Sequence, residues 1–218
     1  MIIASRASNF VFFALFEFEY ALKKSRFTEF FVQHNAIDKF GFREWIFSPG
    51  MLFHSQHKWW EKGGIRRRPH EGLDFCFYRD MTGLNHSLNE KTKIPVMYEG
   101  KVAGIHDDFL GKSLFVSHDF YDEQENRLYT IYGHTNPYPY VDIGRVFREG
   151  EAIAVIAATR KRDSQILSHL HISVAWLPKS FPYNRLSWET MGNRGVATLC
   201  DPLKFIDGNY TIDQEGIA

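Results

Sequence analysis

The sequence predicts a mainly β fold with an antiparallel sheet or sandwich core, and its length and residue patterning carry this prediction. At 218 residues, the chain suits one domain with elaborations rather than two equal domains. From residue 73 onward, short segments are rich in β-branched and aromatic residues. Gly, Asn and Asp separate these segments, as expected for the connections between antiparallel strands.

The expected strands follow one another along the chain. Their sequences are LDFCFY (73–78), IPVMY (94–98), KVAGI (101–105), SLFVSH (113–118), LYTIYGH (128–134), AIAVIAA (152–158) and HLHISVAW (169–176). Short strands of this composition, separated by turn-forming residues, predict an antiparallel sheet or sandwich.

Residues 1–47 are expected to form an N-terminal helical, aromatic segment, and residues 48–218 the main domain. The break falls at Ser48-Pro49-Gly50, where turn-forming residues interrupt the pattern. Between residues 7 and 35 the cues are mixed, but Leu22, Phe27, Phe30 and Phe31 fit one face of a helix. We expect this Phe-rich segment to pack on the sheet domain, because exposed aromatic surface favours aggregation.

Composition limits the partners and the compartment. The 26 basic residues balance the 26 acidic residues, so no overall field favours nucleic acid or an anionic membrane. No stretch approaches the ~20 consecutive apolar residues of a membrane span. We read no signal peptide, since Glu17 and Glu19 interrupt the apolar run at 10–16. Cys76 and Cys200 are too few for a disulfide framework.

Two short motifs point to chemistry. His169 and His171 stand two apart in an expected strand, so their side chains should point to the same side, roughly 6.5–7 Å apart. Chance placement of ten histidines gives roughly 0.5 such pairs, so this spacing alone says little. His70 and Asp74 stand four apart, and theirs is the H-x-x-x-D match that has a Gly between its ends and leads directly into an apolar, aromatic run.

Together with further motifs, this pattern resembles the lysostaphin and LytM type of zinc endopeptidase, which cuts peptide bonds in bacterial peptidoglycan. The resemblance extends from about residue 63 to 206. It rests on the segments GGIRRRPHEGLDF, IPVMYEGKV, LYTIYGH, VDIGRVFREGEAIAVI, HLHISV and CDPLKFI, in the family's order. Six ordered motifs are much harder to produce by chance than one. The resemblance implies a LytM-like fold, of the duplicated hybrid motif or barrel-sandwich type.

The resemblance also implies roles for five residues. His70, Asp74 and His171 would bind Zn²⁺, while His134 and His169 would be catalytic without binding the metal. Two neutral imidazoles and one carboxylate leave a fourth position open, as in catalytic zinc sites. Zinc held in this way activates water and polarises a carbonyl, and the two remaining histidines would hydrogen-bond the nucleophile or the developing oxyanion. The implied function is zinc-dependent hydrolysis of stem or cross-bridge peptides.

Two other functions stay open. The first is a module that binds cell-wall peptides without cutting them, although relatives of that kind tend to have lost ligands and all five positions are present here. The second is a zinc amidase or D,D-carboxypeptidase, which shares the ligand types but not the order of the strand motifs. The resemblance implies the cell envelope, periplasmic or extracellular, and a cytoplasmic location also stays open.

Three departures from the family pattern bear on the substrate. The stretch ATRKRDSQILS replaces a small, Gly-rich loop, so we expect a differently shaped groove. The insertion-like segment 177–199 contains Tyr183 and Trp188, which wall the groove or, as we favour, cover the sheet. The basic run in IRRRPH is interpreted as a solvated loop, with attraction of a carboxylate-bearing substrate as the alternative.

The other histidines are assigned more ordinary places. We expect His118 to be a structural hydrogen-bonding residue. In some relatives, an upstream polar side chain lies on the zinc and makes the enzyme latent; the residues with that potential here are Asn35, His54 and His57. Three further histidines are expected at the surface, namely His34, His86 and His106.

Overall fold

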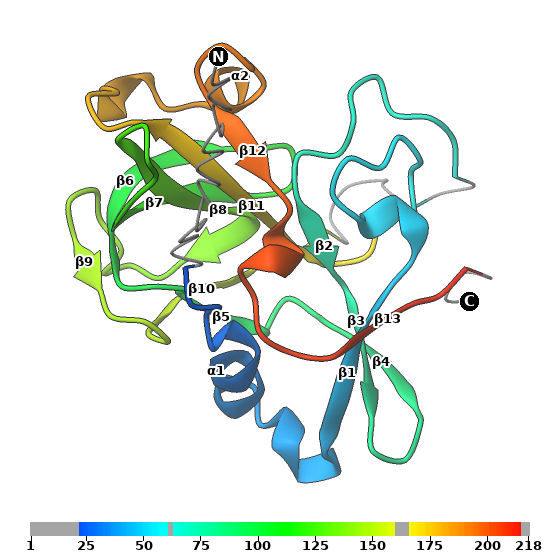
Figure 1. Ribbon diagram of the computed structural model, residues 1–218. Helices are drawn as coiled ribbons and strands as arrows, with labels where there is room; N and C mark the ends of the chain where they lie inside the picture. Colours follow the sequence, from blue (N-terminus) through cyan, green and yellow to red (C-terminus); the bar gives the residue numbers. More distant parts are fainter. Residues whose placement is uncertain (1–21, 61–62, 160–165, 215–218) are drawn as a thin grey trace, which may run out of the picture.

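Strands dominate the computed structural model, which describes residues 22–60, 63–159 and 166–214 (Figure 1). The strands are β1 (Phe42–Phe47), β2 (Leu73–Phe75), β3 (Phe77–Asp80), β4 (Asn85–Ser87), β5 (Lys93–Pro95), β6 (Gly100–Asp107), β7 (Lys112–Tyr121), β8 (Asn126–Pro137), β9 (Val146–Phe147), β10 (Ala152–Ile156), β11 (Leu170–Pro178), β12 (Thr198–Cys200) and β13 (Tyr210–Ile212). The helices are α1 (Phe27–His34) and α2 (Trp188–Met191), with the 3₁₀ turns η1 (Ile37–Phe40), η2 (Pro49–Met51), η3 (Tyr183–Arg185) and η4 (Pro202–Lys204). The mainly β prediction is confirmed.

The described strands form two sheets. The larger, nine-stranded sheet has the order β12-β11-β8-β7-β6-β9; β2 joins it by pairing with β11, and β10 by pairing with β8 and β5. The smaller sheet has the order β13-β1-β3-β4. Apart from the parallel pair β1 and β13, the strands in both sheets pair antiparallel, as predicted. Each of the expected strand segments from residue 73 onward contains strand residues in the structure.

The described part of the N-terminal segment shares the core of the sheet domain. Residues 1–21 lie outside the described residues, so the expected helix can be compared only from residue 22 on. There α1 buries Phe27 and Phe31, whose ring centroids lie 5.7 Å from Phe75 and 5.0 Å from Trp45, respectively. Burying each Phe ring stabilises the fold by about 1.5–3 kcal/mol. Residues 42–47 form β1, which was not predicted; the domain boundary after residue 47 stays a prediction.

Two smaller expectations concern membrane spans and cysteines. None of the described helices has the length and hydropathy that a membrane-spanning helix needs. Cys76 is free and buried, and Cys200 is free and half-buried.

His118 has the structural role that the sequence predicted. It is buried in β7, where Nδ1 donates to the Glu99 carbonyl at 2.9 Å and Nε2 lies 2.8 Å from the Thr130 hydroxyl. A Cβ atom on Gly100 would lie 2.5 Å from Nδ1 of His118, so only glycine leaves room for the ring. Burial lowers the pKa of His118 to about 4, which keeps the imidazole neutral at physiological pH.

The expectation that His34, His86 and His106 lie at the surface is only partly correct, because each is half-buried. His34 donates through Nε2 to the Gly150 carbonyl at 2.7 Å. His86 lies 2.7 Å from Asp80. Nε2 of His106 is buried without a hydrogen-bond partner. The ring nitrogens of His34 and His86 contact neighbouring segments, which the polarity of the local sequence did not indicate.

The depressed pKa of His118 predicts a stability loss at acid pH. Because the folded-state pKa of about 4 lies below the usual value of 6.5, this stability is fully present above pH 6.5 and is lost as the pH falls towards 4. The contribution amounts to about 1.4 kcal/mol per pH unit at most. Chemical denaturation at several pH values should show a shallower acid loss in His118→Gln than in the unchanged chain. Equal slopes would contradict the prediction, whatever the absolute stability of the variant.

Candidate metal centre

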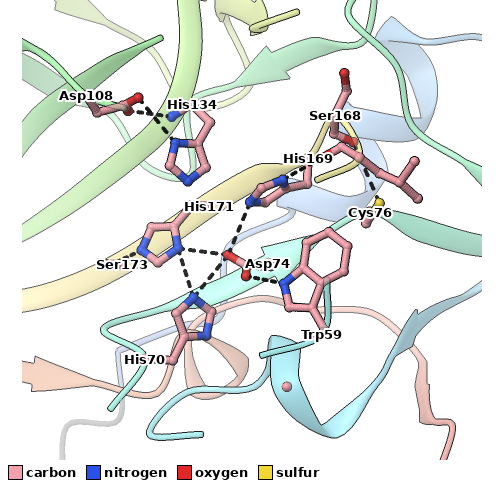
Figure 2. Close-up of polar contacts among 12 residues, drawn as sticks. Trp59, His70, Asp74, Cys76, Asp108, His134, Ser168, His169, His171 and Ser173 are labelled. Carbon is pink, nitrogen blue, oxygen red and sulfur yellow. Dashed lines mark hydrogen bonds and ion pairs between the residues drawn. The ribbon is translucent and has the colours of Figure 1, made fainter. Parts of the chain in front are cut away.

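Three predicted ligands meet where β2 and β11 pair. In this antiparallel pair Asp74 lies directly opposite His171, and His70 comes from the loop just before β2. All three residues are buried, and their side chains point toward one point between the strands (Figure 2). Among the described residues, these three side chains form a group that could hold a metal ion.

The distances between the three inward-facing atoms suit a small cation. Nε2 of His70 lies 3.0 Å from Nδ1 of His171 and 3.1 Å from Oδ1 of Asp74. Nδ1 of His171 and Oδ1 of Asp74 are 2.8 Å apart. Tetrahedral zinc with bonds of about 2.0–2.1 Å would hold its ligand atoms about 3.3 Å apart. A shift of a few tenths of an ångström would therefore bring these atoms to zinc geometry.

The outer atoms of the same side chains fix which atoms face inward. Nδ1 of His70 lies 3.0 Å from the Leu52 carbonyl, which only accepts, so Nδ1 carries the single ring proton whenever this imidazole is neutral. Nε2 is then an acceptor facing another acceptor, Oδ1 of Asp74, at 3.1 Å. Nε2 of His171 is engaged in turn by the Ser173 hydroxyl at 2.9 Å. A metal ion or a proton between these two acceptors would relieve their repulsion, and outer hydrogen bonds of this kind are typical of metal ligands.

The second oxygen of Asp74 is held on the other side. Nε1 of Trp59 donates to Oδ2 at 2.6 Å, and Nη2 of Arg66 lies 3.6 Å from the same oxygen. Arg66 also donates to the Gly50 carbonyl and covers the Trp60 ring. With Oδ2 occupied, Asp74 has Oδ1 free to face the two imidazoles, as a monodentate ligand would.

Burial and neighbouring charges set the protonation of the group. Burial lowers the pKa of His171 to about 4, against the opposing effect of Asp74. For Asp74, burial alone would raise the pKa, but interactions with His70, His169 and His171 outweigh it and hold the pKa well below the usual value. A neutral imidazole and a carboxylate are the forms that bind a metal ion.

Glycine residues leave the space in which His171 sits. A Cβ atom on Gly72 would lie 2.2 Å from the Ile172 carbonyl oxygen and 2.7 Å from Nε2 of His171. On the other side of β11, Gly133 of β8 lies opposite His171, and a Cβ there would approach its Cβ to 3.3 Å. The Gly between His70 and Asp74 therefore lets β2 approach the ligand strand closely.

His169 and His134, the two predicted catalytic residues, lie beside this group. His169 immediately precedes β11 and lies on the same side as His171, with Nε2 3.9 Å from Oδ1 of Asp74. Nδ1 of His169 donates to the Leu167 carbonyl at 2.8 Å, and burial lowers its pKa to about 4. The ring centroid of His134 lies 4.8 Å from that of His169 and 5.8 Å from that of His171. All five predicted residues thus come together (Figure 2).

Asp108, which the sequence analysis did not single out, contacts His134. Its Oδ2 accepts the His134 backbone N–H at 2.8 Å, and its Oδ1 lies 3.3 Å from Nδ1 of the ring. His134 has a positive φ of 61°, which is uncommon for a non-glycine residue. Burial would raise the pKa of Asp108, but His134 and backbone N–H groups lower it, so the carboxylate stays charged.

The residues suggested as blocking groups make no described side-chain hydrogen bond or ion pair with His70, Asp74 or His171. Asn35 hydrogen-bonds the backbone of Phe31 and Lys93. His57 pairs with Ile65 in an isolated bridge, and His54 is exposed. From this upstream region it is Trp59 that reaches the group, and an indole N–H donates but cannot bind a metal.

The insertion-like segment 177–199 covers the sheet and also reaches the site. Tyr183 lies over the sheet, where its hydroxyl contacts Ser117 and Arg127. Trp188 packs against Phe115 but also places its ring centroid 5.4 Å from that of His171. The expectation of a sheet cover is confirmed for Tyr183, whereas Trp188 covers the sheet and also contacts the His171 ring.

The fold and the site together define a mainly β protein with a buried His-Asp-His group that could hold a metal ion. No protein-family model and no curated protein sequence matches the chain. One similar solved structure is the NMR solution structure of lysostaphin, with 16% identity and a TM-score of 0.40, over 75% of this chain and 54% of lysostaphin. Another is Helicobacter pylori Csd3, with 18% identity and a TM-score of 0.33, over 57% of this chain and 30% of Csd3.

The chain spans about half the length of lysostaphin and less than a third of Csd3. The function proposed below rests on the motifs and on the geometry of the site.

We predict that Gly72→Ala damages both the fold and metal binding. The added methyl group would overlap the Ile172 carbonyl and the His171 ring, at a cost of about 1–3 kcal/mol or more. Thermal unfolding and zinc titration should both shift. Gly133→Ala is the matched comparison and should cost less, since its Cβ would lie 3.3 Å from the nearest atom. Unchanged stability and zinc affinity in Gly72→Ala would contradict the close approach.

Proposed function

We propose that this protein is a zinc-dependent metalloendopeptidase that hydrolyses stem or cross-bridge peptides of peptidoglycan in the cell envelope. The observation that carries the proposal is the convergence of Nε2 of His70, Oδ1 of Asp74 and Nδ1 of His171 within 3.1 Å of one another. The peptidoglycan substrate is inferred from the sequence motifs described above.

The donor set favours zinc. Two imidazole nitrogens and one carboxylate oxygen suit Zn²⁺, whereas Mg²⁺ and Ca²⁺ prefer oxygen ligands alone. When bound, zinc would act as a Lewis acid that activates a water molecule and polarises the scissile carbonyl. The protein residues would hold the peptide and the water, and would move protons between them.

His169 is suited to handle a proton. Its Nδ1 proton is committed to the Leu167 carbonyl, so Nε2 of the neutral ring is left as an acceptor toward the site. The lowered pKa favours this neutral form. We infer that Nε2 of His169 accepts a proton from the attacking water and returns it to the leaving amine.

His134 would stabilise negative charge, with Asp108 as its positioning residue. Asp108 holds the His134 backbone N–H at 2.8 Å and faces Nδ1 of the ring at 3.3 Å. A proton on Nδ1 would point toward this carboxylate in the neutral ring, and an imidazolium would be stabilised by it. The contact is longer than an ordinary hydrogen bond, as is common for catalytic groups without substrate.

Digestion of peptidoglycan tests the proposed function. The zinc-loaded protein should release new amino and carboxyl ends within stem or bridge peptides, identified by mass spectrometry on walls of several chemotypes. Chelation should abolish this activity and zinc should restore it.

Asp74→Ala and His171→Ala should lose the metal at micromolar free zinc, whereas His34→Ala should keep about one equivalent. Cleavage at glycan bonds alone would exclude an endopeptidase, and zinc binding without turnover would favour a peptide-binding module.

Variants of His169 and Asp108 should separate chemistry from metal binding. His169→Ala should keep the fold and the zinc while kcat/KM falls roughly 10²–10⁴-fold, as expected when one proton-transfer group is lost. Asp108→Asn retains an acceptor for the backbone N–H but not the charge, and should lower kcat roughly 10–100-fold with little change in KM.

The control for Asp108 is a double variant. His134→Asn removes the imidazole but tolerates the positive φ. Adding Asp108→Asn to His134→Asn should cost little more activity, because both side chains act on the same group. Additive losses would show that Asp108 acts independently of His134. Zinc content and circular dichroism, measured on each variant, would reveal a merely structural defect.

A further inference from the structure

A cavity of about 490 Å³ opens beside the metal centre, and His70 forms part of its wall. Two parts of the chain build it: the stretch from His54 to Glu71 before β2, and the region around α2 and β12. A group bound here would lie next to a predicted metal ligand.

Two arginines give the cavity its charge. Arg68 and Arg194 both line it and are exposed. Neither guanidinium takes part in a hydrogen bond or ion pair with any described residue, whereas Arg66, two residues before Arg68, is held by Asp74 and Gly50. Glu71 is the single acidic side chain in the lining, so two positive side chains accompany one negative side chain there. The cavity therefore favours an anion.

Four apolar residues form one part of the lining. Met191 and Ala197 are buried, and Leu199 and Pro69 are half-buried beside them. The loop on the other side is fixed to His70, since the His54 N–H donates to the His70 carbonyl and the His70 N–H to the Ser55 carbonyl, each at 2.9 Å. A ligand would thus meet two guanidinium groups at an apolar floor with a fixed wall.

We propose that this cavity binds a carboxylate of the peptide substrate close to the bond that is cut. The inference rests on the proposed function and names the class of substrate: a peptide with a carboxylate beside a small aliphatic side chain. Guanidinium groups bind carboxylates through paired, charge-assisted hydrogen bonds, and the apolar floor suits a methyl-sized side chain. A neutral, glycine-only bridge would leave both arginines without a partner and the floor exposed.

The carboxylate has two sources, and a set of peptides separates them. One cleavable peptide should be made with a free carboxyl terminus, with an amidated terminus, and with an amidated terminus plus a carboxylate side chain beside the scissile bond. The form whose kcat/KM exceeds that of the neutral peptide by roughly 10-fold identifies the source. The gain should shrink as salt rises, because exposed charges are screened.

Binding is also measured without turnover. N-acetylalanine should bind more tightly than N-acetylalaninamide in NMR titrations, with both the zinc-loaded and the metal-free protein, since arginines rather than the metal hold it. The double variant Arg68→Gln/Arg194→Gln should reduce the affinity for N-acetylalanine roughly 10-fold, to that of the amide. Arg67→Gln, in the same loop but outside the cavity lining, is the matched control and should change nothing.

The outcomes distinguish the two proposals. Equal affinities for acid and amide, or unchanged binding in the double variant, would overturn the carboxylate site even if peptides are cut. Carboxylate binding that depends on Arg68 and Arg194, without cleavage of any peptide, would support the site and overturn the proposed function. Loss of N-acetylalanine binding on zinc removal alone would assign the anion to the metal and reject the cavity.

Discussion

The pairing of β2 with β11 is the constraint on which the site depends. It sets Asp74 opposite His171, while β8 pairs with the other edge of β11 and sets Gly133 opposite the same histidine. A slip of one residue in the β2 pairing would turn Asp74 to the opposite face of the sheet. The pairing requires glycine at position 72, because the backbone there lies so close to the Ile172 carbonyl that a Cβ atom would not fit. Strand β11 thus aligns residues from β2 and β8 around His171.

The two carboxylate oxygens of Asp74 have different partners. Oδ1 faces the histidines, while Oδ2 takes the Trp59 N–H at 2.6 Å and lies near Arg66. Burying a carboxylate is costly unless its oxygens are paired. Trp59 and Arg66 offset part of this cost before any metal is bound, and they fix the carboxylate in one orientation. The loop before β2 therefore contributes one predicted ligand, His70, and also the two side chains that hold Asp74 in place.

The sequence predicted the strands and a group of five residues that lie together in the structure, but it did not predict the residues that support this group. Period-two patterns of β-branched and aromatic residues are strong from residue 73 onward, and ordered motifs identified His70, Asp74 and His171. Strands β9, β12 and β13 have two or three residues each, too few for a pattern. Asp108 was missed because its local sequence reads as an ordinary turn: it accepts N–H groups of Leu110 and Gly111, and its contact with His134 is long-range.

Charge around the centre links the metal site to the cavity beside it. Zinc with one carboxylate and two neutral imidazoles would have a net charge of about +1. Arg66 lies 3.6 Å from the carboxylate, and Arg68 and Arg194 line the cavity that His70 shares. Such a field opposes protonation of His169, in the same direction as the burial that lowers its pKa. It also favours a carbonyl oxygen that gains negative charge. The same positive field would thus bind an anionic substrate, keep the proton acceptor neutral and stabilise the developing oxyanion.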